Sequence, residues 1–326
     1  MRAIVIREPG GPEVLELRDV PTPQPSRGEV RVRVKATAVN RADLLQRMGV
    51  YPAPTGSPPD CPGLEVAGEV DAVGEGVTEL AQGDRVFGIV GGGGYAERVV
   101  VPARTLAPLP PGLPFTEAAA VPEAFVTAWD AVVDQAGLTA GEVLLVSAVG
   151  SGVGTAGVQI ARAIGARAVG TTRSAHKLAR ARQLGLDDGF VVEGPAFARE
   201  VLARTHGRGV DVVLELAGGP YVAEDLACIA PLGRIVVVGT MAGARVDLDL
   251  STLMRKRCQL RGTVLRSRPL EEKILAARAL ARHVAPLLAS GALRPVVDRI
   301  LPLEQAADAH RAMQSNDTFG KIVLEV

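Results

Sequence analysis

The chain has 326 residues, of which 47% are hydrophobic, so it is long enough to bury a sizeable core and to form about two domains. Lys plus Arg and Asp plus Glu both number 36, and the net charge of zero gives no electrostatic basis for a nucleic-acid or acidic-membrane partner. No apolar run reaches the ~20 residues of a membrane span and charges interrupt the start of the chain where a signal peptide needs an apolar core, so a cytoplasmic location is predicted.

The first third of the chain is rich in predicted strands. In residues 29–39, valine alternates with arginine or lysine, which is the two-residue period of a half-buried strand. A segment rich in Pro and Gly follows, and strand-like runs then come at 64–73, 84–90 and 95–102. This pattern predicts a β-rich, barrel-like region.

From Thr116 the pattern changes to helix-length stretches that alternate with short apolar strands. The strands lie at 143–148, 167–172, 189–192, 211–216 and 234–239. Such alternation predicts a parallel, doubly wound α/β sheet. The chain then continues with an amphipathic helix at 270–291, a strand at 295–303, a helix at 303–314 and a closing strand at 320–326.

A loop of small residues joins the first strand of this alternating region to the next helix. Gly150, Gly152 and Gly154 lie in the loop, at a spacing that departs from the G-x-G-x-x-G dinucleotide fingerprint. A helix that begins near Gly152 presents unpaired backbone N–H groups and a positive dipole end to a pyrophosphate. The strand, loop and helix together predict a dinucleotide site, and the alternative is a plain tight turn in an α/β protein.

The residues after the second strand indicate which dinucleotide binds. An NAD-preferring site places Asp or Glu there to hold the ribose 2′-hydroxyl, and no acid occurs between Glu142 and Asp187. Arg173 and Lys177 supply positive charge instead, next to the hydroxyl of Ser174. The segment therefore favours NADP(H), unless the two cations belong only to a solvated helix start.

Metal and hydrolytic chemistry find little support in the sequence. All four histidines lie beyond residue 175, and Cys61 is the only cysteine of the β-rich region, whereas catalytic zinc needs converging Cys and His ligands. Three dispersed cysteines form no disulfide framework. No G-x-S-x-G elbow or P-loop occurs. Hydride transfer without a metal is therefore favoured.

Segments spread over nearly the whole chain match one family in combination. They read PGGPEVLEL, AVNRADLLQRMGVYP, PGLEVAGEV, GDRVFGIV, AAAVPEAFVTAW, SGVGTAGVQIAR, GVDVVLELAGG, GRIVVVG and GKIVLEV. These resemble the zinc-free quinone oxidoreductases of the medium-chain dehydrogenase/reductase superfamily, the zeta-crystallin-like group, and most closely its tumour-suppressor-inducible branch. Leu64 stands where zinc-dependent relatives carry a histidine. Ala148 and Gly154 match the family loop A-x-x-G-x-x-G, with Ser151 at the middle glycine.

The resemblance implies an NADPH cofactor and the residues that contact it. These residues are Thr127, Ser151, Gly152, Val153, Gly154, Ser174, Lys177, Gly239, Thr240 and Leu265, and the charge argument adds Arg173. Many relatives carry a tyrosine on the adenosine side where this chain has Val192. That departure predicts weaker binding of the adenosine or a less strict preference for NADPH over NADH.

The resemblance also implies a catalytic set of Asn40, Asp43 and Tyr51 in a cleft between domains. Hydride delivery to a quinone or enone leaves an oxyanion, so the site needs donors near that oxygen and a proton. Asn40 donates without titrating, Tyr51 offers a hydrogen bond or a proton, and water is the expected final proton source. The alternatives are a turn closed by Asn40, a helix cap at Asp43 and loop packing of Tyr51.

Together these features predict an NADPH-dependent, zinc-independent quinone oxidoreductase. The expected architecture is a GroES-like barrel catalytic domain at 1–123 and 268–326 with a Rossmann NADP(H)-binding domain at 124–267. The alternatives are an enone, alkenal or enoyl-thioester reductase and, from another class, an NADPH-binding protein with little turnover. By analogy the chain is expected to form a homodimer or homotetramer, with residues 260–266 as a pairing strand.

Overall fold

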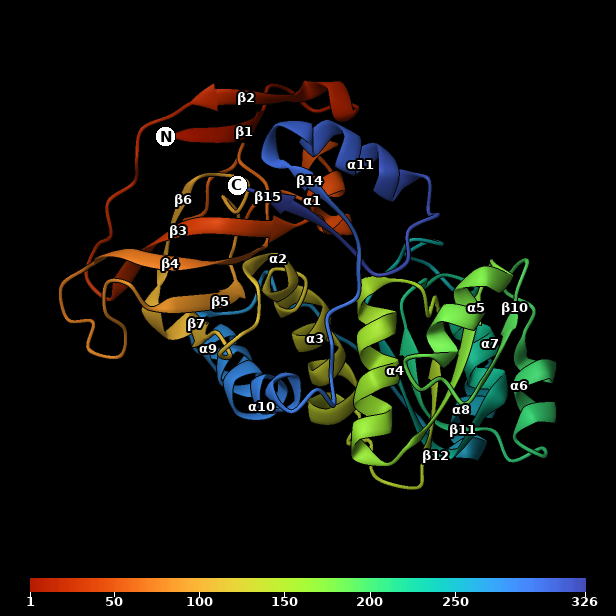
Figure 1. Cartoon of the computed structure of the whole chain (residues 1–326). Coiled ribbons are helices and arrows are strands. Elements are labelled where there is room, and N and C mark those ends of the chain that lie inside the picture. Colours follow the sequence, from red (N-terminus) through yellow and green to blue (C-terminus); the bar gives the residue numbers. More distant parts are fainter. The chain divides into compact units, whose positions relative to one another are not determined.

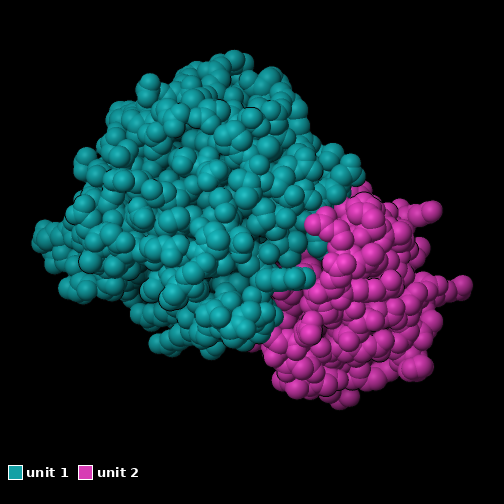
Figure 2. Space-filling view, in the orientation of Figure 1, with its two compact units in different colours: residues 1–126, 265–326 teal, residues 127–264 magenta.

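A computed structural model describes all residues from 1 to 326 (Figure 1). The chain divides into two units: unit 1 consists of residues 1–126 and 265–326, and unit 2 of residues 127–264 (Figure 2). Unit 1 therefore joins the two ends of the chain, whereas unit 2 is one continuous segment. The assignment of a catalytic role to one and NADP(H) binding to the other stays a prediction.

Unit 2 is built on a six-stranded parallel sheet in the order β10-β9-β8-β11-β12-β13. Its strands are β8 (Val143–Val146), β9 (Arg167–Thr172), β10 (Asp188–Val191), β11 (Val210–Glu215), β12 (Ile229–Val237) and β13 (Gln259–Gly262). Its helices are α4 (Gly152–Ile164), α5 (Ala175–Arg182), α6 (Ala198–Arg204), α7 (Tyr221–Cys228) and α8 (Leu250–Lys256). The chain enters at β8, runs outward to β10 and returns to β11, which confirms the predicted doubly wound α/β sheet.

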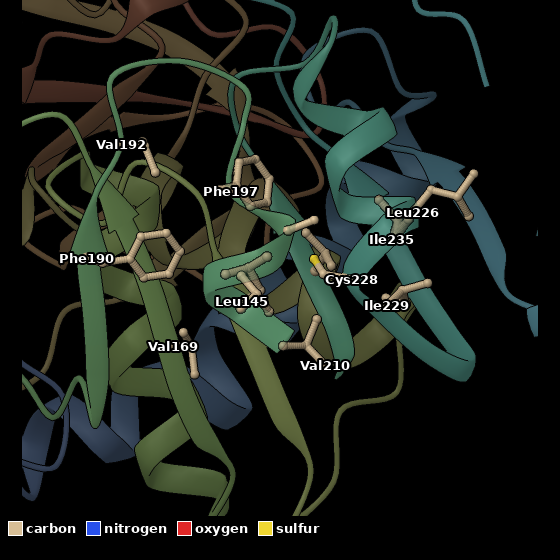
Figure 3. Close-up of a cluster of buried hydrophobic side chains, with 13 residues drawn as sticks. Leu145, Val169, Phe190, Val192, Phe197, Val210, Leu226, Cys228, Ile229 and Ile235 are labelled. Atoms are coloured by element: carbon tan, nitrogen blue, oxygen red, sulfur yellow. The ribbon is translucent and has the colours of Figure 1, made fainter. Parts of the chain in front are cut away.

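Most residues of the inner strands β8, β9 and β11 are buried, as expected where helices cover a parallel sheet. All six residues of β11 are buried. Leu145 of β8, Val169 of β9 and Phe190 of β10 belong to one cluster of buried side chains, which Figure 3 shows. Val192 and Phe197 also belong to this cluster. Val192 is thus a core residue, 7% exposed, and the predicted effect of a valine at this position on adenosine binding stays a prediction.

The edge strand β13 is exposed along all four of its residues. Nearby, Leu250 and Met254 of α8 are 62% and 75% exposed. The strand is shorter than the predicted pairing strand at 260–266. It ends at Gly262, and the hydroxyl of the next residue, Thr263, donates a hydrogen bond to Asp130 at 2.7 Å. Pairing of two chains through β13 stays a prediction.

Unit 1 contains a seven-stranded sheet in the order β14-β15-β3-β4-β5-β7, with β6 paired to β3, and a separate pair formed by β1 and β2. Its strands are β1 (Arg2–Ile6), β2 (Leu15–Asp19), β3 (Glu29–Ala38), β4 (Glu65–Val73), β5 (Arg85–Ile89), β6 (Arg98–Pro102), β7 (Leu106–Pro108), β14 (Val297–Pro302) and β15 (Lys321–Glu325). The predicted β-rich region is present, and the two C-terminal strands complete its sheet. In β3, Val30, Val32 and Val34 are buried as the alternation predicts.

Helices of unit 1 flank this sheet and the connections around it. They are α1 (Arg41–Arg47), α2 (Phe115–Ala118), α9 (Leu270–Ala279), α10 (Ala285–Ala289) and α11 (Ala306–Gln314), together with α3 (Pro122–Trp129), whose last three residues belong to unit 2. Short 3-10 helices occur at Pro12–Val14, Ala103–Thr105 and Leu303–Gln305, and π-helical turns at Asp130–Gln135 in unit 2 and Leu280–Val284 in unit 1. The second π-helical turn interrupts the predicted helix at 270–291 just before Pro286, which has no N–H to continue the α-helical bonding.

None of the helices combines the length and the hydropathy that crossing a membrane requires. The cytoplasmic location stays a prediction.

Candidate functional site

The carboxyl edge of the parallel sheet has its switch point between β8 and β11, where consecutive connections leave in opposite directions. Ligands of doubly wound proteins bind at such a point. Ser147 follows β8, and its hydroxyl accepts a hydrogen bond from the Leu216 N–H at 2.7 Å and lies 3.3 Å from the Leu214 carbonyl oxygen. The side chain of Ser147 therefore ties the loop after β8 to the end of β11.

The predicted phosphate loop forms the turn into α4. Ser151 is the N-cap residue of this helix, and its Oγ accepts a hydrogen bond from the Gly154 N–H at 3.0 Å. The N–H groups of Gly152 and Val153, in the first helical turn, have no intrahelical acceptor. They are the donors that an anionic pyrophosphate needs. Ser151 thus rigidifies the loop with its side chain, and the backbone beside it offers the open donors.

Gly154→Ala is expected to destabilise the protein by about 1–3 kcal/mol, the usual cost of overpacking, and to weaken NADPH binding. A Cβ at this position would lie 2.4 Å from the Ala148 carbonyl oxygen and 2.9 Å from the Val149 Cα, so the loop would have to move. Thermal unfolding and NADPH titration measure the two effects. Gly262→Ala is the control because a Cβ there meets no atom within 4 Å. Equal behaviour of the two variants would contradict the tight packing of the loop.

The residues predicted to face the adenosine lie at the end of β9 and the start of α5. Arg173 is exposed and makes no ion pair. Ser174 is the N-cap residue of α5, and its Oγ lies 2.7 Å from His176 Nδ1. Lys177 is buried to 9% exposure on the first turn of α5. The structure therefore brings Arg173, Ser174 and Lys177 to one turn, and their contact with a 2′-phosphate stays a prediction.

The loops after β11 and β12 contact each other at the same edge of the sheet. A Cβ on Gly239 would lie 2.5 Å from the Leu216 carbonyl oxygen, and one on Gly218 would lie 2.8 Å from the Thr240 Cα. The buried carboxylate of Glu215 accepts hydrogen bonds from the backbone N–H groups of Ala217 and, at 2.7 Å, of Gly218. Gly239 and Thr240, both predicted cofactor residues, thus lie on the loop beside the switch point.

Asp43 lies in a buried polar network of unit 1 at the start of α1. Its Oδ2 accepts a hydrogen bond from the Asn40 N–H at 2.7 Å, and its Oδ1 accepts one from the Gly63 N–H at 2.9 Å. Burial raises the pKa of Asp43 to about 6, against the effect of these donors. The carboxylate therefore caps α1 and holds the 61–63 loop. A helix cap is the structural alternative that the sequence analysis gave for Asp43.

Asn40 has protein partners for every polar atom of its side chain. The Nδ2 donates to the Ala38 carbonyl at 3.1 Å and to Glu65 Oε1 at 2.8 Å, and the Oδ1 accepts from Lys321 Nζ at 2.5 Å. The amide is thus engaged in the network and presents no free donor. A direct contact of Asn40 or Asp43 with a substrate stays a prediction, and the geometry gives both residues a positioning role.

His310 continues the network and has a defined tautomer. Arg47 Nη1 lies 3.2 Å from His310 Nδ1, and because arginine only donates, Nδ1 accepts and the proton resides on Nε2. That proton faces the Tyr95 hydroxyl at 3.2 Å, and the hydroxyl in turn lies 3.4 Å from Asp43 Oδ2. Burial and then Arg47 lower the pKa of His310 to about 3. The imidazole is therefore neutral at physiological pH.

A buried ion pair within unit 1 joins β4 of the N-terminal segment to β15 of the C-terminal segment. Lys321 Nζ lies 2.7 Å from Glu65 Oε1 and also donates to the Val39 carbonyl at 3.1 Å. The side chains of Lys321 and Glu65 are 6% and 0% exposed. The sequence analysis did not single out either residue. Only the pairing of β15 with β3, which no local pattern encodes, brings Lys321 to this place.

Glu123 lies in the first turn of α3. The sequence analysis predicted no role for this residue, although it lies in the segment AAAVPEAFVTAW. Its backbone N–H donates to Glu65 Oε2 at 2.8 Å, and its own Oε2 is buried without a hydrogen-bond partner. Burial, and next the nearby Glu65 carboxylate, raise the pKa of Glu123 to about 8. The carboxyl group therefore holds a proton at neutral pH, and an acid with a pKa perturbed in this way is a candidate for a functional site.

Tyr51 is half-buried against Arg266, whose guanidinium carbon lies 5.3 Å from the centre of the tyrosine ring. Arg266 is itself buried and donates to Gln46 Oε1 at 2.5 Å and to the Gly91 carbonyl at 3.0 Å. Burial raises the pKa of Tyr51, and Arg266 opposes this shift. The hydroxyl of Tyr51 makes no hydrogen bond and is a protonated donor at neutral pH. The ring of Tyr51 therefore packs against its neighbours, as the structural alternative predicts, and its hydroxyl is also free to donate a hydrogen bond.

Unit 1 contains a cavity of about 690 Å³ that is lined in part by Gly91 and Arg266. This volume lies in the ~300–1,000 Å³ range of small-molecule sites. Its wall includes the predicted cofactor residue Leu265, the apolar Val126 and the basic Arg266, Arg268 and Lys273. Leu265 is buried to 7% exposure.

The structure offers no cluster of metal ligands around Leu64, the residue predicted to stand in place of a zinc-binding histidine. Leu64 is 1% exposed, and no group of three or more His, Cys, Asp or Glu side chains has an arrangement that could hold a metal ion. Burial raises the pKa of the Cys61 thiol to about 12, so it stays protonated and ligates metals poorly. Zinc-independent chemistry stays a prediction.

Comparison with protein families and relatives gives consistent results along the chain. Residues 26–111 match the family described as alcohol dehydrogenase GroES-like domain, and residues 152–281 match the family described as zinc-binding dehydrogenase. The quinone oxidoreductase of Lama guanicoe is 35% identical over 327 residues, covering 99% of this chain and 97% of that protein. A segment of the polyketide synthase GfsB of Streptomyces halstedii is 39% identical over 301 residues, covering 92% of this chain and 5% of the synthase.

Solved structures resemble the whole chain. A structure described as an NAD-dependent alcohol dehydrogenase is 37% identical, with a TM-score of 0.87 and complete coverage of both chains. A mycobacterial protein solved in complex with NADPH is 30% identical, with a TM-score of 0.89 and complete coverage of both chains. With the matched GroES-like family, these findings confirm the predicted fold class.

Proposed function

Because the chain belongs to the medium-chain dehydrogenase/reductase superfamily, in the group of the quinone oxidoreductases, we propose that it transfers hydride from NADPH to quinones or related activated carbonyl compounds without zinc. The observation that carries this proposal is the buried Oε2 atom of Glu123, which has no hydrogen-bond partner, in a unit that also holds a cavity of about 690 Å³; burial raises the pKa of this carboxyl group to about 8. Reduction of a carbonyl group needs such a proton source beside the acceptor.

The residues present fit a bound NADPH. The Gly152 and Val153 N–H groups would hold the pyrophosphate, and Arg173, Ser174 and Lys177 would face the 2′-phosphate, where an NAD site carries an acid instead. Bound NADPH supplies the hydride for the reduction. One structural relative is described as NAD-dependent, so the preference of this chain for NADPH over NADH has to be measured.

Residues of unit 1 would handle the charge that hydride transfer leaves on the acceptor. Addition of hydride to a quinone produces a hydroquinone monoanion, which takes up one proton. We infer that the Tyr51 hydroxyl donates a hydrogen bond to this oxygen and that Glu123 supplies the proton, after which water reprotonates the Glu123 carboxylate. We infer a positioning role within the buried network for Asn40, Asp43 and Lys321, because the polar atoms of these side chains already have partners.

Reduction of an enone, alkenal or enoyl thioester is the second candidate function. The segment of a polyketide synthase that is 39% identical to this chain favours it, because such synthases build acyl chains on thioesters. The same site would protonate the enolate that remains after hydride adds to the C=C bond.

The deciding assay is oxidation of NADPH and NADH by the chelator-treated protein with 1,4-benzoquinone, 9,10-phenanthrenequinone or a small enone. We expect quinone turnover with NADPH, at a kcat/KM at least tenfold above that with NADH, because no acid occupies the ribose position and Arg173 lies beside it. Turnover only with the enone would favour the second candidate. Preference for NADH would contradict the 2′-phosphate assignment, and tight NADPH binding without any turnover would indicate a binding protein.

A further inference from the structure

We propose that the cavity of unit 1 binds an anionic group of the acceptor, so that the preferred substrate is a quinone or enone that bears a carboxylate, sulfonate or phosphate. This inference rests on the proposed function and narrows its substrate class. It is drawn from the composition of the cavity wall, in which the Lys273 ammonium has no ion-pair partner and the Arg266 guanidinium donates to no carboxylate.

The wall of the cavity combines an apolar part with a basic part. Val90, Val126, Leu265, Ala277 and Leu280 supply apolar contacts suited to a carbon ring. Arg266, Arg268 and Lys273 supply the positive charge. A small amphipathic molecule with one acidic substituent matches both parts.

The basic residues of the wall exceed the acids that face them. Arg266 donates to carbonyl and amide oxygens only, and its charge is not neutralised by a contacting carboxylate. Arg268 Nε lies 3.8 Å from Glu272 Oε2, and that glutamate side chain is 56% exposed. Glu29 is the only acid on the wall, and its Oε2 accepts a hydrogen bond from the Ser26 N–H at 3.0 Å.

Lys273 is the decisive member of this set. It belongs to α9, lines the cavity and is partly buried, and its side chain makes no hydrogen bond or ion pair. Partial burial, and next the charge of Arg266, lower its pKa. A partly buried cation without a counter-ion is costly, and an anionic ligand would remove that cost. Lys273 and Arg266, which line the same cavity, therefore supply the positive charge that an oxyanion would need.

The test compares a neutral and an anionic ligand of the same ring system on the full chain. 1,4-Naphthoquinone and 1,4-naphthoquinone-2-sulfonate serve as substrates, and naphthalene-2-sulfonate and 2-naphthalenemethanol serve as non-reducible ligands for calorimetry. Lys273→Met is expected to raise the KM of the sulfonated quinone and the Kd of naphthalene-2-sulfonate about tenfold, with little change for the neutral pair. Lys273→Arg should retain the discrimination. Lys35→Met, which removes a half-exposed lysine elsewhere in the unit, is the matched control.

The two readouts separate failure of this inference from failure of the proposed function. Equal effects of Lys273→Met on the neutral and anionic ligands, or no binding of naphthalene-2-sulfonate to the unmodified chain, would overturn the inference even if quinones are reduced. Binding of naphthalene-2-sulfonate that depends on Lys273 would support it even if no quinone is reduced, in which case only the proposed function fails. Thermal unfolding of each variant checks that the fold is intact.

Discussion

Replacing Glu123 with glutamine is expected to lower kcat for quinone reduction by about 10²–10⁴-fold, the range that general acid catalysis contributes. Glutamine has nearly the same shape as a protonated glutamic acid, so it can occupy the same place at the start of α3. The backbone N–H that bonds to Glu65 also remains. The substitution therefore removes a transferable proton and little else. Binding of NADPH is expected to stay unchanged.

The pH dependence of the same reaction gives an independent check. The pKa of Glu123 is raised to about 8, so the carboxyl group is protonated below this pH and ionised above it. A reaction that needs the acid form must lose rate as the pH rises through about 8, and this falling limb should be absent from Glu123→Gln. The rate is therefore measured from pH 6 to 10 for both proteins.

A matched control separates catalysis from a general effect of removing an acid. Glu117→Gln changes an exposed glutamate on α2 and should leave both kcat and the pH profile unaltered. If Glu123→Gln kept a high kcat and the same falling limb, the proton would come from another group, and Tyr51 would be the next residue to test.

The raised pKa of Glu123 also predicts how stability changes with pH. In the unfolded chain the carboxyl group titrates near its ordinary value of about 4.3, and in the folded chain it keeps its proton to a higher pH. The contribution of this carboxyl group to the free energy of unfolding is therefore fully present below the pKa of the unfolded chain. It is lost as the pH rises through about 8. Burial next to Glu65 is the cause of both the pH dependence of the rate and the pH dependence of stability.

Local patterns were sufficient for the elements whose residues contact near neighbours in sequence. The valine alternation predicted β3, and the apolar runs with a small-residue loop predicted β8 and the start of α4 at Gly152. Ser151 is the N-cap residue of α4, and its side chain accepts a hydrogen bond from the Gly154 N–H, which fixes the loop despite its irregular glycine spacing. These features depend on backbone geometry over a few residues.

The buried network of unit 1 was not predictable in the same way. Lys321 reaches Asn40 only because β15 pairs with β3, and Arg266 reaches Tyr51 from a distant part of the chain. Glu123 reads as an ordinary acid in the first turn of a helix, and only its burial beside Glu65 gives it a raised pKa. Charge state at these positions is a property of tertiary contacts, which periodicity and spacing do not contain.

Lys321→Met is expected to destabilise the protein by about 3–5 kcal/mol, because it leaves the Glu65 carboxylate buried without its cation. Glu65 is completely buried and would retain only the Asn40 amide and the Glu123 N–H as donors. The change in the free energy of unfolding is measured by urea denaturation, with Lys35→Met as the control. Lys35 forms a half-exposed pair with Glu69 at 3.5 Å, so its loss should cost only about 0–1 kcal/mol.

The double variant Lys321→Met with Glu65→Gln tests the reason for this loss. Removing both charges leaves no isolated ion in the core, so the pair of substitutions should be less destabilising than Lys321→Met alone. If the losses of the two single variants simply added, the two side chains would act independently. Recovery of stability without recovery of kcat would then show that the ion pair also serves the reaction, by positioning Asn40 and Glu123, which both donate to Glu65, or through the Glu65 charge that raises the pKa of Glu123.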